Sequence, residues 1–166
     1  KMRLCSIASG SSGNCIYVGS DNTHVLVDIG ISGKKMETGL NSLELTGRDL
    51  DGILITHEHS DHIKGLGVIS RKYGIPIYAT AGTVDAMVRT NALGKIPEGI
   101  FHEIQEDEPF MINDLKVNPF TIPHDAAQPV GYRLEHEGHS VGIATDLGKY
   151  NDYIIENLQG LDALLL

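Results

Sequence analysis

The sequence has only two cysteines among its 166 residues, Cys5 and Cys15. Two are too few for a disulfide framework, and in a reducing compartment both side chains would be thiols. Neither has a second cysteine or a histidine close to it in the sequence. We therefore interpret them as small buried hydrophobic residues on neighbouring strands and not as metal ligands.

Long apolar segments are absent as well. No run of residues approaches the length of about 20 that a membrane-spanning helix needs. The first residues, KMRLCSIASGSSG, also lack the long apolar core of a signal peptide. These absences predict a cytoplasmic protein that is not attached to a membrane.

Basic residues are scarce, with 13 Lys and Arg against 22 Asp and Glu and a net charge of −9. An overall attraction to a phosphate backbone is therefore not expected. A pair of bound divalent cations would offset part of this charge locally, so nucleic acid is not excluded as a substrate.

The pattern of short segments predicts an α/β fold in one domain that spans residues 1–166. The chain is long enough for one core, and its 41% hydrophobic content is that of a globular protein. Strands are expected first, followed by alternating strands and helices, which indicates a mixed sheet covered by helices. We expect strands within 2–8, 14–20, 24–30, 51–56, 75–80, 103–124, 129–146 and 161–166, and helices at 33–45, 62–73, 82–94 and 151–160. The last strand has no turn or polar cap after it, so the chain is expected to be cut short.

One segment, ITHEHSDHIKG at residues 55–65, is unusually rich in titratable side chains. His57 and His59 are two residues apart, and in an extended segment such side chains share one side of the backbone. Glu58 and Ser60 would then be spacers. A buried strand precedes the cluster and a helix follows it, so it is expected on a strand-to-helix turn, where loop side chains converge.

Such a cluster favours a bound cation. Converging imidazoles and a carboxylate lower one another's proton affinity unless a positive ion lies among them. Nitrogen and oxygen ligands of this kind suit zinc, manganese or iron. The alternative is a solvated polar turn that happens to be rich in histidine.

Other candidate ligands stand at the ends of predicted strands. Alone, His124 would be read as a hydrogen-bonded loop histidine and Asp146 as a helix cap, but beside the first cluster both become candidate ligands. Asp28, before Gly30, could cap a loop or orient a ligating imidazole. The glycine-rich loop 8–14 is either a tight connection or an anion-binding nest.

The remaining histidines are expected on the surface, away from any chemistry. They are His24, His102, His136 and His139.

The segment THEHSDH, residues 56–62, resembles the His-x-His-x-Asp-His signature of the metallo-β-lactamase superfamily, and Asp28, His124 and Asp146 follow its expected order. Within the superfamily, segments such as ASGSSGN and IPHDAAQPVGY are similar to the WalJ-type branch of bacterial hydrolases. The resemblance implies a four-layer αββα sandwich, apparently truncated at its C-terminus.

The resemblance also implies a set of ligands for two divalent metal ions, zinc first and manganese or iron as alternatives. His57, His59 and His124 would hold one metal. Asp61 and His62 would hold the second, and Asp146 would bridge both. A further histidine of the family is expected beyond Leu166.

The implied function is dinuclear-metal-dependent hydrolysis, as a phosphodiesterase or 5′-to-3′ DNA exonuclease that uses a hydroxide bridging the metals. Asp61 would be catalytic, taking a proton from the nucleophilic water. The alternatives are a small-molecule hydrolase of a thioester, lactone or cyclic phosphodiester, and a non-catalytic metal-binding domain.

Overall fold

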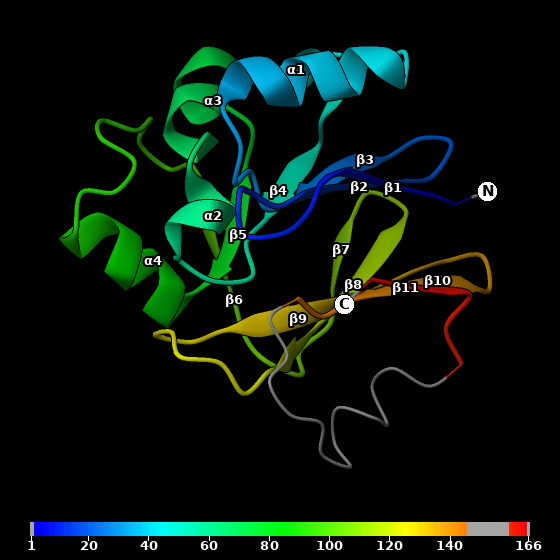
Figure 1. Ribbon diagram of the computed structural model, residues 1–166. Coiled ribbons are helices and arrows are strands. Elements are labelled where there is room, and N and C mark those ends of the chain that lie inside the picture. The colour runs from blue at the N-terminus through cyan, green and yellow to red at the C-terminus, as the bar shows by residue number, and fades with distance from the viewer. Residues whose placement is uncertain (1, 146–159, 166) are drawn as a thin grey trace.

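The computed structural model describes residues 2–145 and 160–165 (Figure 1). Its first sheet has six strands in the order β1-β2-β3-β4-β5-β6. The first three strands pair antiparallel and the last three continue in parallel, which is the predicted mixed sheet. The strands are β1 Arg3–Ala8, β2 Cys15–Gly19, β3 His24–Val27, β4 Gly52–Leu54, β5 Ile77–Thr80 and β6 Phe101–Ile104.

The second sheet has five strands in the order β11-β10-β9-β8-β7. Four of them form antiparallel hairpins, and β11 pairs in parallel with β10. The strands are β7 Phe110–Ile112, β8 Leu115–Thr121, β9 Val130–His136, β10 His139–Ile143 and β11 Ala163–Leu165.

Helices cover the face of the first sheet that points away from the second (Figure 1). Alternation along the strands separates two cores: on β3, Leu26 packs with the helices, while Val25 and Val27 pack against the second sheet. The helices are α1 Gly33–Ser42, α2 Ser60–Ile63, α3 Leu66–Tyr73 and α4 Ala81–Arg89, with a short 3₁₀ helix η1 at Gly47–Asp49.

The α/β class and the first three layers of the predicted sandwich are confirmed, as helices, sheet and sheet. A second layer of helices is not found in the part of the chain that the structure describes. The helix expected at 151–160 lies almost wholly outside that part, as does Asp146. None of the helices in residues 2–145 and 160–165 is long and apolar enough to cross a bilayer.

The single helix expected over 62–73 is wrong, because the structure has two helices, α2 and α3, separated at Gly65. The Gly65 amide donates to the carbonyl of Ile29 at 2.8 Å. A Cβ on Gly65 would lie 2.2 Å from the carbonyl oxygen of Ile31. The interruption therefore comes from close contact with a distant loop, which helical periodicity does not reveal.

Candidate metal centre

The candidate site forms where β3 and β4 end side by side. These strands are parallel, so the residues that follow them, Asp28 and Thr56, meet at one edge of the first sheet. The Thr56 amide donates to Asp28 Oδ1 at 2.8 Å, and the Thr56 hydroxyl donates to Asp28 Oδ2 at 2.7 Å. Asp28 is 1% exposed and has a positive φ of 63°. This pair forms the buried base of the site.

Main-chain hydrogen bonds fix the turn that carries the histidine motif. The Asn14 amide donates to the carbonyl of Asp61 at 2.8 Å, and the Ile29 amide donates to the carbonyl of His62 at 2.9 Å. Gly30 lies so close that a Cβ there would be 1.7 Å from the Asp61 carbonyl oxygen. Loops before β2 and after β3 therefore hold α2 against the first sheet.

Three of the predicted ligands come together as one cluster of imidazoles. His57, His59 and His124 each offer a ring nitrogen, and these three atoms lie within 4.8 Å of one another. The ring centroids are 4.7 Å apart for His57 and His59, 4.6 Å for His57 and His124, and 4.9 Å for His59 and His124. Two segments about 65 residues apart along the chain thus meet at one point.

His62 extends the cluster, with its ring centroid 4.0 Å from that of His57. Its Nδ1 lies 2.6 Å from Asp28 Oδ2. Because the Asp28 carboxylate accepts hydrogen bonds, Nδ1 carries the proton and Nε2 keeps its lone pair. The side-chain nitrogen of Asn14, Nδ2, lies 3.2 Å from that Nε2, which fits a donor facing a lone pair. The contact with Asp28 that was predicted as one of two alternatives is therefore present.

Thr56 fixes the tautomer of His57 in a similar way. The Thr56 hydroxyl donates its proton to Asp28, so its oxygen is an acceptor for His57 Nδ1 at 3.0 Å. His57 then donates from Nδ1, and its Nε2 also keeps a lone pair. One buried carboxylate sets the tautomers of two imidazoles in this way.

Burial governs the charges at the base of the site. Desolvation, followed by the nearby rings of His62, His124 and His59, lowers the pKa of His57 to about 2. Desolvation also raises the pKa of Asp28, while hydrogen bonds from His62 and Thr56 oppose that rise. His57 is therefore a neutral imidazole at physiological pH, the form that binds metals.

The donor set fits a divalent cation. His124 Nε2 is buried and has no hydrogen-bond partner within the described ranges, whereas buried polar atoms in native proteins are normally paired. Asp61 Oδ2 lies 3.7 Å from His62 Nε2, so a carboxylate adjoins the imidazoles. Several imidazoles and a carboxylate at one point suit zinc, with manganese or iron as alternatives.

Most of the sequence-predicted site residues are in this place. His57, His59, His62, His124, Asp61 and Asp28 lie together, while Asp146 is outside the described residues. The sequence did not single out the contacts made by Asn14, Thr56 and Gln128, since nothing near them in the chain marks their partners. Glu58 was read as a spacer, yet its Oε2 accepts a hydrogen bond from the Ala127 amide at 3.0 Å.

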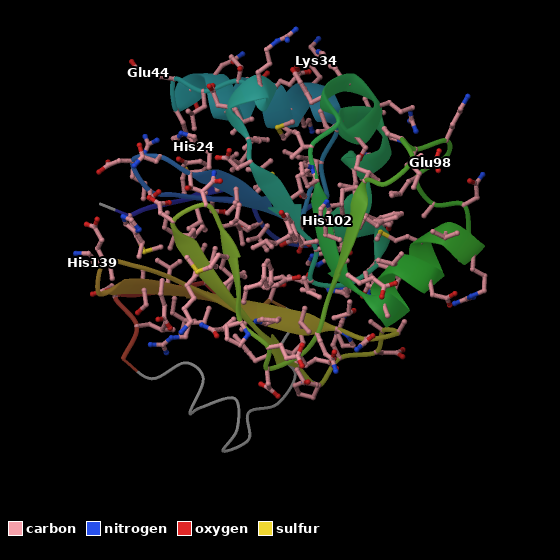
Figure 2. All side chains as sticks on the ribbon, turned by 180° about the vertical axis from the view of Figure 1, so that it is seen from behind. His24, Lys34, Glu44, Glu98, His102 and His139 are labelled. Carbon is pink, nitrogen blue, oxygen red and sulfur yellow. The ribbon has the colours of Figure 1, made fainter. Side chains whose placement is uncertain are left out.

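Of the remaining histidines, His24, His102 and His139 lie apart from one another in the molecule (Figure 2), while His136 is the cross-strand partner of His139. His102 and His139 are exposed, as expected. The surface assignment was wrong for the other two. His24 is half-buried, with Nδ1 2.6 Å from the Tyr17 hydroxyl, and the His136 side chain is only 9% exposed. Both are end residues of strands, His24 the first of β3 and His136 the last of β9, and each has a hydrogen-bonding neighbour there.

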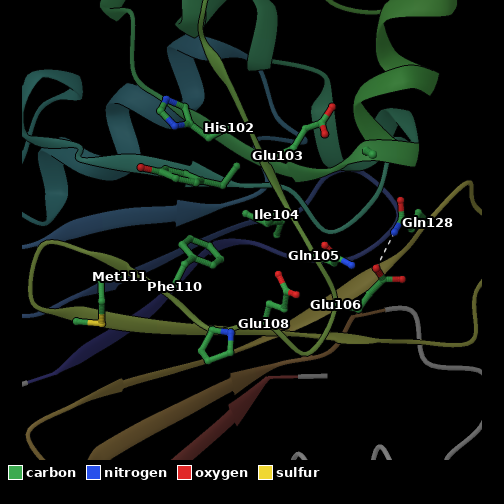
Figure 3. A pocket seen from close by; sticks show the side chains of 12 residues that line it. His102, Glu103, Ile104, Gln105, Glu106, Glu108, Phe110, Met111 and Gln128 are labelled. Atoms are coloured by element: carbon green, nitrogen blue, oxygen red, sulfur yellow. Dashed lines mark hydrogen bonds between the residues drawn. The ribbon is translucent and has the colours of Figure 1, made fainter.

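A groove of about 710 Å³ lies beside β6, β7 and the start of α4, and none of the predicted ligands lines it (Figure 3). Glu103, Glu106 and Glu108 line it with Tyr78 and Phe110. Gln128 also contributes to this groove, from the loop that carries His124.

The comparisons with known proteins agree with this geometry. A family model described as a beta-lactamase superfamily domain matches residues 23–166. The chain belongs to the beta-lactamase superfamily. Exodeoxyribonuclease YycJ of Bacillus anthracis is 40% identical over 159 residues, which are 96% of this chain and 60% of that protein. Exodeoxyribonuclease WalJ of Streptococcus pneumoniae serotype 2 (strain D39) is 41% identical over 157 residues, or 93% of this chain and 58% of that protein. The chain thus spans about three fifths of these relatives.

Solved structures show the same fold. The metallo-beta-lactamase fold protein YhfI of Bacillus subtilis superposes with a TM-score of 0.78 at 18% identity, over 98% of this chain and 69% of that one. Zinc-bound PqqB of Methylobacterium extorquens superposes with a TM-score of 0.75 at 18% identity, over 91% of this chain and 58% of that one. The chain therefore has the metallo-beta-lactamase fold, as the motif predicted.

Proposed function

We propose that the protein is a metal-dependent phosphodiesterase that degrades DNA as a 5′-to-3′ exonuclease. The observation that carries this proposal is the convergence of His57, His59 and His124 within 4.8 Å, in a chain 40% identical to a protein named exodeoxyribonuclease. The proposal places these residues in one domain, 1–166. It also places the protein in the cytoplasm, in keeping with free thiols at Cys5 and Cys15.

His57, His59 and His124 would hold one divalent cation, and Asp61 and His62 would hold a second. Asp146, which lies outside the described residues, would bridge the two. Divalent cations at such a site supply Lewis acidity: they lower the pKa of water and offset the charge that develops on a phosphoryl group. Zinc is the first candidate, because four imidazoles dominate the donor set.

Asp61 is the proposed acceptor of the proton from the attacking water. Its side chain is 32% exposed, in contrast to the fully buried His62 beside it, so solvent and substrate can reach the carboxylate. The side-chain Nδ2 of Asn14 lies 3.5 Å from Asp61 Oδ2 and limits its orientation. The buried Asp28 and Thr56 hold the imidazoles and do not meet substrate.

The first test is release of a label from the 5′ end of double-stranded DNA. We expect the metal-stripped protein to be inactive and to recover cleavage with added Zn²⁺ or Mn²⁺. Asp61→Ala is expected to abolish cleavage, while Asp85→Ala, which removes an exposed carboxylate on α4, is expected to retain it. Cleavage by Asp61→Ala at the wild-type rate would refute the assignment of Asp61.

A small-molecule hydrolase is the second candidate function, favoured by the net charge of −9, which opposes binding of a long polyanion. A chromogenic phosphodiester, a thioester and a lactone, tested beside DNA with the same metal, separate the two functions. Turnover of one of these with no DNA cleavage would replace the exonuclease proposal.

A further inference from the structure

Glu58 stands between two of the clustered histidines in the sequence. Its Oε2 accepts a hydrogen bond from the main-chain amide of Ala127 at 3.0 Å. Ala127 is three residues after His124. The bond therefore joins the segment that carries His57 and His59 to the loop that carries the third imidazole.

The far end of that loop is fixed separately, by Gln128. Its side-chain oxygen accepts from the Gly82 amide at 2.7 Å, and its side-chain nitrogen donates to Glu106 Oε1 at 2.6 Å (Figure 3). Its main-chain carbonyl accepts from the Thr80 hydroxyl at 2.8 Å. These bonds attach the loop to the start of α4 and to the segment after β6, and none of them reaches the histidine motif.

The backbone supplies one further link between the two segments, from the Val130 amide to the carbonyl of Thr56 at 3.0 Å. Val130 is six residues from His124, too far along an irregular loop to fix the direction of its ring. Between His124 and Ala127, the Ala126 amide donates to the His124 carbonyl at 3.0 Å and closes a tight turn. A constraint at Ala127 is therefore transmitted to His124 through three residues of closed turn.

The environment of Glu58 argues for a specific role. Its second carboxylate oxygen, Oε1, is buried and accepts no hydrogen bond from any described residue. Leaving a buried carboxylate oxygen without a partner costs free energy, and such groups in native proteins call for an explanation. A solvated lysine, serine or glycine would fill a mere spacer position without that cost.

We propose that Glu58 is a positioning residue for His124: its bond to the Ala127 amide holds the ring nitrogen of His124 toward those of His57 and His59. This inference rests on the proposed metal site. Groups that orient metal ligands typically change metal affinity about 10-fold to 100-fold when they are lost. The expected effect is therefore on affinity for the cation held by these three imidazoles.

The test compares three substitutions of Glu58 in the full chain, by titrating metal-free protein with Zn²⁺ against a chromophoric chelator. Glu58→Ala removes the acceptor, and Glu58→Asp keeps the charge but is one methylene too short. Both are expected to weaken the binding of the first Zn²⁺ by about 10-fold or more. Glu58→Gln keeps an acceptor oxygen at full reach and is expected to stay within about 3-fold of wild type.

The matched control is Asp125→Ala, which removes an exposed carboxylate from the same loop and should leave Zn²⁺ affinity unchanged. A role of the negative charge alone gives the opposite order, with Glu58→Asp like wild type and Glu58→Gln like Glu58→Ala. That order, or wild-type affinity in Glu58→Ala, would overturn the proposal.

A second measurement, amide hydrogen exchange of the metal-free protein, separates this inference from the proposed function. The Ala127 amide is expected to exchange faster in Glu58→Ala and Glu58→Asp than in wild type and Glu58→Gln. Unchanged exchange in all variants would overturn the role of Glu58 whatever the protein hydrolyses. The expected order of Zn²⁺ affinities in this series, without DNA cleavage by wild type, would refute only the exonuclease. Failure of wild type to bind Zn²⁺ would refute the metal site itself.

Discussion

The four clustered imidazoles form two pairs that are held in different ways. His57 and His62 are fully buried, and both are hydrogen-bonded through Nδ1 to the base of the site at the end of β3 and β4. His59 and His124 are half-buried, and His124 lies in a loop between strands of the second sheet. His57 and His62 thus belong to the core of one layer, whereas His124 reaches the cluster from the other sheet. Stability and metal affinity should therefore respond differently to changes on the two sides.

Replacement of Asp28 by alanine should remove the support of the buried pair, His57 and His62, and should have the largest effect on stability. It would leave His62 Nδ1 and two donors of Thr56 buried without their acceptor. A buried donor left without its acceptor costs about 1 to 3 kcal/mol, and three donors are affected here. The free energy of unfolding of the metal-free protein in urea measures the loss. Asp28→Asn, which keeps an acceptor oxygen and the volume, should lose less. A loss below about 1 kcal/mol in Asp28→Ala, the net value of one ordinary hydrogen bond, would contradict the assigned role.

Gly30→Ala should be next in size and should act on the proposed second metal site, Asp61 and His62, alone. The new methyl group would overlap the Asp61 carbonyl, so the loop and α2 must separate. Overpacking of this kind costs about 1 to 3 kcal/mol. We expect lower stability and fewer bound cations in metal analysis, with the first site, formed with His124, retained. Loss of both cations together would show that the two sides are not independent.

Thr56→Val sharpens the comparison, because it removes one hydroxyl and keeps the shape of the side chain. His57 Nδ1 would lose its acceptor, while the contact between His62 and Asp28 would remain. The expected loss of stability is about 1 to 2 kcal/mol, together with weaker binding of the first Zn²⁺. Thr56→Ser retains the hydroxyl and should bind Zn²⁺ like wild type. Equal Zn²⁺ affinity in Thr56→Val would contradict the link from Asp28 to His57.

Asp114→Ala provides the smallest effect and tests a contact between the sheets at the opposite end of β2. The Asp114 carboxylate accepts from the hydroxyls of Thr23 and Ser20, in the turn before β3. We expect a loss of about 1 kcal/mol at neutral pH and unchanged Zn²⁺ affinity. A change in Zn²⁺ affinity would show that the two ends of the layers are coupled.

The same variant has a defined dependence on pH. The hydrogen bond from the Thr23 hydroxyl lowers the pKa of Asp114 most. The Ser20 hydroxyl and the nearby His136 ring lower this pKa further, against a partial desolvation that raises it. A lowered pKa in the folded state stabilises the protein above the ordinary aspartate value of about 3.9, and this contribution disappears as the pH falls through the folded pKa. The difference in unfolding free energy between wild type and Asp114→Ala should therefore be constant from pH 7 to 5 and decrease below about pH 4. A difference that grows in acid would have the wrong sign.

Much of this architecture could be predicted from the sequence, because local patterns encode it. The β-branched residues within 24–30 and the apolar run within 51–56 predicted β3 and β4, and the spacing of His57, His59 and His62 predicted the cluster at their ends. The interruption of the helix at Gly65 could not be predicted in this way, since it depends on the loop after β3. The contacts of Glu58 and Gln128 were missed for the same reason: their partners lie 69 and 46 residues away in the chain.

Main-chain groups fix the course of the turn at 57–65, through the amides of Asn14, Ile29 and Gly65. Every amino acid offers a carbonyl, and all but proline offer an amide. The route of the chain is thus independent of most side chains that stand on the turn. Replacement of a metal-ligating side chain on this turn would therefore alter the preferred ion or the reaction while the backbone of the turn keeps its course. Because main-chain groups fix the turn and side chains supply the chemistry, this turn is a favourable starting point for evolving, or engineering, a different hydrolytic specificity.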